Sequence, residues 1–171
     1  AALYILIPVQ KALHGPTTPG NENLKDLNDD YLNKFDALII FANQDSIAAP
    51  QEKALLKYVA SGHGLVALHC ASWCFRNSPE FVKMVGGQFW RHKMDSIRIK
   101  NDMPGHLALK DFPGIKTVDE TYLHSKLQPD NIVLQSRIIG PEQANDKPGA
   151  STEPYTWVRT RSEEHTSELQ S

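Results

Sequence analysis

The sequence has little cysteine, no long apolar run and no large excess of charge of one sign. Its 171 residues include two cysteines, too few for a disulfide framework, so we interpret Cys70 and Cys74 as thiols. No apolar run approaches the length that spans a bilayer, and no signal-peptide pattern opens the chain. We therefore expect no membrane span in this sequence and no fold held together by disulfides.

The C-terminal residues 161–171 differ from the rest of the chain. They match, residue for residue, the translation of a common short-read sequencing adapter, and we interpret them as an artefact outside the fold. Without them the 18 basic residues lose one and the 20 acidic residues lose three, which leaves no net charge. Balanced charge gives no indication of binding to nucleic acid or to a membrane surface. Residues 1–160 have the length of one domain, which we expect to be incomplete.

A helix followed by a buried strand and a polar loop is the clearest pattern. Residues 50–60 begin with proline and carry an apolar stripe, and Gly62 follows where a left-handed cap is needed. The apolar runs 36–41 and 65–69 predict two buried strands, one on each side of this helix. Strands joined in this way run parallel through a right-handed crossover, so the sequence predicts a βαβ unit.

Other elements are predicted on both sides of this unit. We expect a short helix over residues 79–85, which ends at a pair of glycines, and a weak helix or turn within 22–34. Further strands are predicted over residues 96–100, 119–123, 131–137 and 155–160. Residues 3–9 fit a strand or the remainder of a helix, and we expect loops over 14–21 and 141–154.

Ionisable and polar residues appear where the strand over 65–69 ends. Ligands of open α/β sheets bind at the carboxyl ends of the strands, where His69, Cys70 and Ser72 would lie. Histidine is a common base and metal ligand, although a lone histidine in such a place is more often a hydrogen-bonded core residue. Cys70 is a candidate nucleophile, but it lacks the flanking glycines of a sharp nucleophile elbow.

Two later segments offer further groups for such a site. Residues 86–92 turn at two glycines and then present Phe89, Trp90 and His92, although an ordinary surface loop explains this pattern equally well. In the strand predicted over 119–123, alternation directs Glu120 and Tyr122 to one face and Asp119 to the other. Carboxylate and imidazole together suit a metal site or an acid–base pair, but no short metal motif such as HExxH is present. The other histidines, His14, His63, His106 and His124, we assign to surface or turn structure.

Several of these segments, taken in order, resemble the ThuA-like (trehalose utilisation) domain. They are residues 35–43, 50–56, 64–72, 75–80, 86–89 with His92, 119–122 and 155–159. The resemblance implies an α/β fold of the class I glutamine-amidotransferase-like superfamily. That fold is a flavodoxin-like, three-layer sandwich with a mostly parallel central sheet, here truncated at both ends. Because Cys70 lacks the glycines that flank the amidotransferase nucleophile, glutaminase chemistry is not implied.

The resemblance also implies a bacterial protein of carbohydrate metabolism, cytoplasmic or periplasmic, that acts on trehalose, a related disaccharide or a keto-sugar. In this hypothesis His69, Glu120 and Cys70 are the catalytic candidates, and a divalent metal, if one is used, would be held by His69, His92 and Glu120. The residues expected to contact the sugar are Ser72, Phe89, Trp90, His92 and Tyr122. The alternative is a non-catalytic binding or scaffold module that supports a sugar dehydrogenase or a haem-binding partner. A cysteine hydrolase is the third hypothesis.

Overall fold

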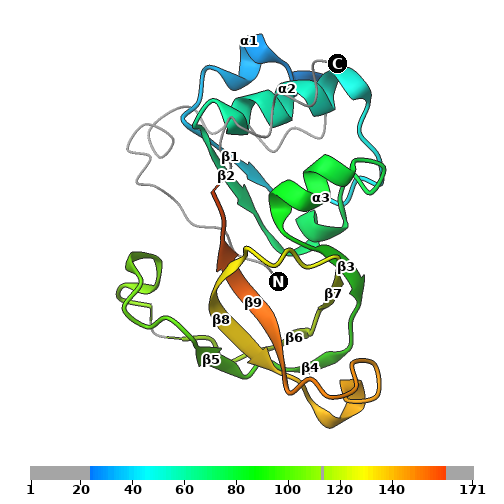
Figure 1. The fold of residues 1–171 in the computed structure, drawn as a ribbon, viewed down its shortest axis with the longest axis vertical. Coiled ribbons are helices and arrows are strands. Elements are labelled where there is room, and N and C mark those ends of the chain that lie inside the picture. The colour runs from blue at the N-terminus through cyan, green and yellow to red at the C-terminus, as the bar shows by residue number, and fades with distance from the viewer. Residues whose placement is uncertain (1–23, 113, 161–171) are drawn as a thin grey trace.

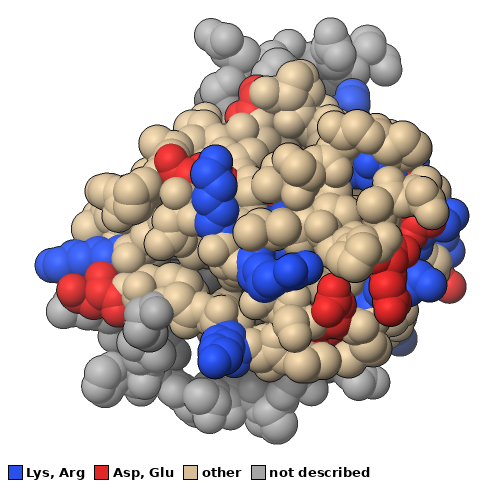
Figure 2. Space-filling model, turned by 90° about the horizontal axis from the view of Figure 1, so that it is seen from below, with Lys and Arg blue, Asp and Glu red and all other residues tan. Residues whose placement is uncertain are grey.

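The computed structural model describes residues 24–112 and 114–160. The α-helices gather with one pair of strands at one end of the molecule, and the remaining strands form the other end (Figure 1). On the face shown in Figure 2, basic and acidic side chains are interspersed. In the described part of the chain, no helix has the length and apolar composition needed to cross a membrane. The predictions for residues 3–9, 14–21 and 161–171 lie outside the described residues.

The predicted βαβ unit is confirmed. Strands β1 (Ala37–Ile40) and β2 (Gly64–Ala67) pair in parallel over their whole length, and helix α2 (Ala49–Ala60) connects them. Pro50 lies in the first turn of α2, where its missing N–H has no intrahelical partner to lose. Gly62 follows the helix with φ of 98°, a left-handed conformation that glycine adopts without steric cost.

The prediction of a flavodoxin-like, three-layer sandwich with a mostly parallel central sheet is wrong. Within residues 24–112 and 114–160, β1 and β2 form the only parallel pair, and all other strand pairs are antiparallel. Parallel strands need a long crossover connection, usually a helix. After helix α3 (Pro79–Val85), the described chain contains only 3-10 turns between its strands, so these strands pair antiparallel in small sheets. Their orders are β1–β2, β3–β7, β4–β6 and β5–β8–β9.

The antiparallel strands are short, except for the last two. They are β3 (Gln88–Arg91), β4 (Met94–Ser96), β5 (Ile99–Asn101), β6 (Val118–Glu120), β7 (Leu123–Ser125), β8 (Ile132–Ile138) and β9 (Thr152–Val158). The strand predicted over 96–100 is divided between β4 and β5, and the one over 119–123 between β6 and β7. The strand predicted over 131–137 is confirmed as β8, whereas the last strand begins inside the loop expected over 141–154.

The remaining helical elements are a few residues long. The weak helix expected within 22–34 corresponds to a 3-10 turn and one helical turn, and α3 is confirmed with the predicted bounds. The elements are η1 (Leu24–Asp26), α1 (Asp29–Leu32), η2 (His69–Trp73), η3 (Leu107–Leu109) and η4 (Pro141–Gln143).

One apolar core connects the helical end to strand β9. Leu55 from α2, Phe81 and Val85 from α3, and Trp157 from β9 are buried together in it. The indole Nε1 of Trp157 donates a hydrogen bond of 2.9 Å to the carbonyl oxygen of Val85. Each such side chain contributes about 1.5–3 kcal/mol by leaving water, so this core holds the two ends of the molecule against each other.

Candidate functional site

His69 begins the turn η2 immediately after the parallel pair of strands. Its φ of 49° lies in the left-handed region, where the Cβ of a residue other than glycine crowds the following carbonyl oxygen. Such a conformation costs about 1–2 kcal/mol, and residues held in it cluster at functional sites. The hydrogen bond from Ala71 N to the carbonyl oxygen of Leu68 closes the turn at 3.0 Å.

Glu120 ends strand β6, and Tyr122 lies in the two-residue interruption before β7. The Tyr122 hydroxyl donates a hydrogen bond of 2.9 Å to Oε2 of Glu120. The two side chains therefore lie together as predicted, although the strand itself ends at Glu120.

His69 and His92 meet Glu120 from the two sides of its carboxylate. Nε2 of His69 lies 3.4 Å from Oε2, and Nδ1 of His92 lies 3.2 Å from Oε1. Nδ1 of His69 is also 3.0 Å from the Tyr122 hydroxyl oxygen. Because that hydroxyl gives its one proton to Glu120, we assign Nδ1 of His69 as the donor to the hydroxyl oxygen. We call His69, His92, Glu120 and Tyr122 the Glu120 cluster.

Solvent reaches three of the four side chains in the Glu120 cluster. The exposed fraction is 29% for the His69 side chain, 32% for Glu120 and 41% for His92. Tyr122 is buried, and this burial together with its hydrogen bond to Glu120 raises the pKa of the phenol. The phenol therefore keeps its proton at neutral pH and acts as a hydrogen-bond donor.

Aromatic rings lie beside the Glu120 cluster. Phe89 packs edge-to-face against Tyr122, with ring centroids 4.6 Å apart, and its ring centroid is 5.8 Å from that of His92. The Trp73 ring meets Phe89 at 5.4 Å. Trp90 lies instead under the guanidinium of Arg91, 3.9 Å from its ring centroid. Of the two aromatic residues predicted for sugar contact in β3, the structure thus places Phe89 against the cluster.

The match to a family model decides where the chain belongs. The ThuA model, described as trehalose utilisation, matches residues 12–166. The chain belongs to the ThuA family. Two solved ThuA-like structures share its fold, one from Bacteroides uniformis ATCC 8492 and one from Parabacteroides merdae ATCC 43184. Their TM-scores are 0.59 and 0.61, at 20% and 17% identity.

These structures are longer than the ThuA-family chain. Their alignments cover 81% and 84% of this chain but 59% and 62% of the Bacteroides and Parabacteroides proteins, respectively. At this level of identity the likeness shows a common fold and nothing of the chemistry. No curated protein matches the chain.

Two residues that the sequence placed at the site lie beside the Glu120 cluster in the ThuA-family chain and are not among its four members. Burial and the nearby Glu120 carboxylate raise the pKa of the Cys70 thiol, so it is protonated at neutral pH and is a weak nucleophile. Ser72 is buried, and its hydroxyl donates a hydrogen bond of 3.3 Å to the carbonyl oxygen of His69. Ser72 therefore braces the strained turn from inside.

Metal binding by His69, His92 and Glu120 stays a prediction from the sequence. Across the described ranges of the ThuA-family chain, no group of three or more His, Cys, Asp or Glu side chains has an arrangement that could hold a metal ion. The two imidazoles each pair with Glu120 directly.

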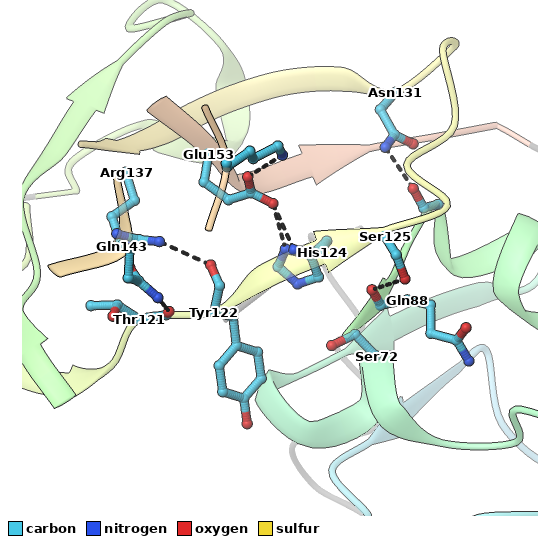
Figure 3. A network of polar contacts seen from close by, with 12 residues as sticks. Ser72, Gln88, Thr121, Tyr122, His124, Ser125, Asn131, Arg137, Gln143 and Glu153 are labelled. Atoms are coloured by element: carbon cyan, nitrogen blue, oxygen red, sulfur yellow. Dashed lines mark hydrogen bonds and ion pairs between the residues drawn. The ribbon is translucent and has the colours of Figure 1, made fainter. Parts of the chain in front are cut away.

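The assignment of His124 to surface or turn structure is wrong, because His124 is buried in strand β7, next to Glu153 (Figure 3). Its Nδ1 lies 3.2 Å from Oε1 of Glu153, and its backbone N–H donates a hydrogen bond of 2.8 Å to the same oxygen. Lys147 pairs with the other oxygen, Oε2. Burial lowers the pKa of His124. Burial alone would raise the pKa of Glu153, but the hydrogen bonds from His124 and Lys147 lower it. Glu153 is therefore charged and His124 neutral.

Sequence reasoning missed two aromatic neighbours of the site, Phe41 and Trp73. Phe41 follows β1, and its ring centroid lies 6.1 Å from that of His69. Trp73 ends the same turn that His69 begins, and its Nε1 donates a hydrogen bond of 2.9 Å to Asp45. Their position in the sequence could have identified them, because Phe41 and Trp73, like His69, follow the carboxyl ends of the two parallel strands.

Proposed function

We propose that the chain contributes a sugar-binding, acid–base site to a carbohydrate-utilisation protein. The sugar is trehalose or a related disaccharide, or the keto form of one. The observation that carries this proposal is one carboxylate, Glu120, in contact with two imidazoles and a phenol. The membership of the ThuA family supports the sugar as the class of ligand.

The side chains around Glu120 match the chemistry of a sugar. Sugar hydroxyls need both donors and acceptors, which the carboxylate, the imidazoles and the phenol supply together. The apolar face of a sugar ring packs against an aromatic ring, and Phe89 lies beside the cluster. A few polar groups next to aromatic rings are typical of small-molecule sites.

With a keto-sugar the cluster can move a proton next to the carbonyl. Glu120 takes the proton from the carbon beside the carbonyl, and the electron pair of that C–H bond forms a C=C bond. The carbonyl π pair moves onto oxygen, which takes a proton from one of the imidazoles. The product is an enol, and the reverse steps return it to a ketone. Hydrolysis by two carboxylates is less well supported, because strand alternation directs Asp119 away from Glu120.

Proton exchange in heavy water tests this proposal. The chain is incubated in D2O with keto-trehalose, and NMR follows the hydrogen on the carbon beside the carbonyl. We expect exchange above the buffer rate, reduced about 100-fold or more in Glu120→Gln and unchanged in Asp119→Asn. Loss of exchange in both variants, or no exchange with any keto-sugar, contradicts the proposed chemistry. Capture of a dehydrogenase or haem-binding partner without exchange would support the scaffold alternative.

A further inference from the structure

The two residues between β6 and β7 make hydrogen bonds with three separate segments of the chain, which contribute Lys93, Arg137 and Gln143. Thr121 donates from both its backbone N and its hydroxyl to the carbonyl oxygen of Lys93, at 2.7 and 2.9 Å. Gln143 Nε2 donates to the carbonyl oxygen of Thr121 at 2.7 Å. Arg137 Nη2 donates to the carbonyl oxygen of Tyr122 at 3.0 Å. The backbone that carries Tyr122 is thus secured by buried side chains.

Arg137 uses its donors on backbone carbonyls although it is buried. Its exposed fraction is 2%, and Nη1 donates to the carbonyl oxygen of Ile138 at 3.2 Å. Burying a guanidinium is costly unless opposite charge and acceptors compensate for lost water. The carboxylates of Glu153 and Asp95 supply part of that charge. Arg137 thus donates its hydrogen bonds to backbone carbonyls, one of which belongs to a residue of the candidate site. This arrangement indicates that Arg137 holds the backbone of the site in place.

Figure 3 shows that the backbone carbonyl and the phenol ring of Tyr122 extend in different directions. The carbonyl of Tyr122 points to Arg137, while its phenol ring extends in the opposite direction. The hydroxyl at the far end of that ring meets His69 and Glu120. A shift of the backbone at residue 122 would therefore move the hydroxyl away from both partners.

We propose that Arg137 is a positioning residue that sets the distance between the Tyr122 hydroxyl and His69 by holding the Tyr122 carbonyl. Its importance for turnover rests on the proposed function, but its effect on geometry does not. Catalytic groups displaced by about 1 Å lose as much as 100-fold in rate. Holding the backbone from behind leaves the exposed side of the cluster open to a ligand.

The test compares Arg137→Met with Gln135→Met in the full chain, without any sugar. Gln135 lies on the same strand with an exposed fraction of 1%, and it bonds Asn101 and Thr156 and not the segment 118–123. The readout is the ring ¹⁵N NMR signals of His69, because the hydrogen bond at one imidazole nitrogen sets the state of the other. Tyr122→Phe, which removes the hydroxyl, defines the full displacement of these signals.

We expect Arg137→Met to displace the His69 signals in the direction of Tyr122→Phe, and Gln135→Met to leave them at wild-type positions. Arg137→Lys is expected to give a smaller displacement, because an ammonium cannot reproduce the planar fork of donors. This variant also serves if Arg137→Met does not fold. Wild-type His69 signals in a folded Arg137 variant overturn the proposal, as does an equal displacement in Gln135→Met. If the His69 signals move but keto-sugar exchange is absent in the wild type, only the proposed function fails.

Discussion

Nδ1 of His69 lies 3.0 Å from the hydroxyl oxygen of Tyr122, although 53 positions separate the two residues in the chain. His69 comes from the turn after the parallel strands, and Tyr122 comes from the interruption between two antiparallel strands. The Glu120 cluster therefore forms only where the two ends of the molecule meet. Changes in the shared core should disturb it even when they lie far from Glu120.

The backbone strain at His69 leads to a first prediction. His69→Gly and His69→Ala remove the same imidazole, but only alanine keeps a Cβ in the left-handed conformation. We expect His69→Gly to be more stable than His69→Ala by about 1 kcal/mol in denaturant unfolding, because glycine adopts this conformation without a clash. Equal stability of the two variants, or a more stable alanine variant, would show that the turn is not strained.

Some of this arrangement is readable from the sequence because its signals are local. Proline at the start of α2, its apolar stripe and Gly62 predict the helix, and the flanking apolar runs predict the parallel pair. Alternation in the next segments is enough to place Glu120 and Tyr122 on one face. The left-handed conformation of His69 has no such signal, because only a few per cent of residues other than glycine adopt it.

The rest of the fold depends on partners far away in the chain. The strand over 119–123 is divided because its two halves pair with different strands, β6 with β4 and β7 with β3. Burial of His124 depends on Glu153, 29 positions later. The expectation of a mostly parallel sheet came from the resemblance, and the absence of crossover helices after α3 decides against it within the described residues.

The Cys70 thiol is expected to react slowly. Its raised pKa leaves little thiolate at neutral pH, and reactivity should increase only as pH rises above the ordinary thiol range. We expect iodoacetamide at pH 7.5 to modify Cys70 about tenfold more slowly in the folded chain than in urea. Mass spectrometry measures the rate of modification. Cys70→Ala should retain keto-sugar exchange. Rapid modification of Cys70 alone in the folded chain would contradict this prediction and support the cysteine hydrolase hypothesis.

The buried pair His124 and Glu153 predicts a loss of stability in acid. The folded pKa of His124 lies below its ordinary 6.5, so the unfolded chain binds the proton first as pH falls. Stability is therefore lost from about pH 6.5 downward, through the folded pKa, at up to about 1.4 kcal/mol per pH unit. Glu153, whose folded pKa lies below its ordinary 4.5, adds a second loss from about pH 4.5 downward.

His124→Asn isolates the first of these losses, because an amide can replace the donor at Nδ1 but does not titrate. Urea unfolding from pH 7 to pH 5 should give a shallower dependence on pH for this variant than for the wild type. Parallel curves for the two proteins would mean that His124 takes up its proton equally in the folded and unfolded chains.

Substitutions at Gly86 and Gly62 test how closely β9 packs against the end of α3, because only Gly86 lies at this contact. Both have left-handed φ, but a Cβ at Gly62 meets nothing within 4 Å, whereas one at Gly86 lies 2.6 Å from Trp157 and 2.7 Å from Arg159. We expect Gly62→Ala to lower the free energy of unfolding by about 1 kcal/mol and Gly86→Ala by at least about 2 kcal/mol, because crowding adds to backbone strain. Thermal unfolding compares them, and equal losses would argue against this packing.

Calorimetric titration with trehalose tests most directly whether the Glu120 cluster is the sugar site. The Asp119 carboxylate accepts a hydrogen bond of 2.8 Å from the backbone N–H of Glu120, whereas the Glu120 carboxylate meets the two imidazoles. Glu120→Gln and Asp119→Asn therefore remove the same charge in different places. We expect the wild type and Asp119→Asn to bind one sugar per chain, and Glu120→Gln to bind at least about tenfold more weakly, because a hydrogen bond to a charged group is lost. Equal binding by all three proteins, or loss of binding in Asp119→Asn alone, would contradict a sugar site at Glu120.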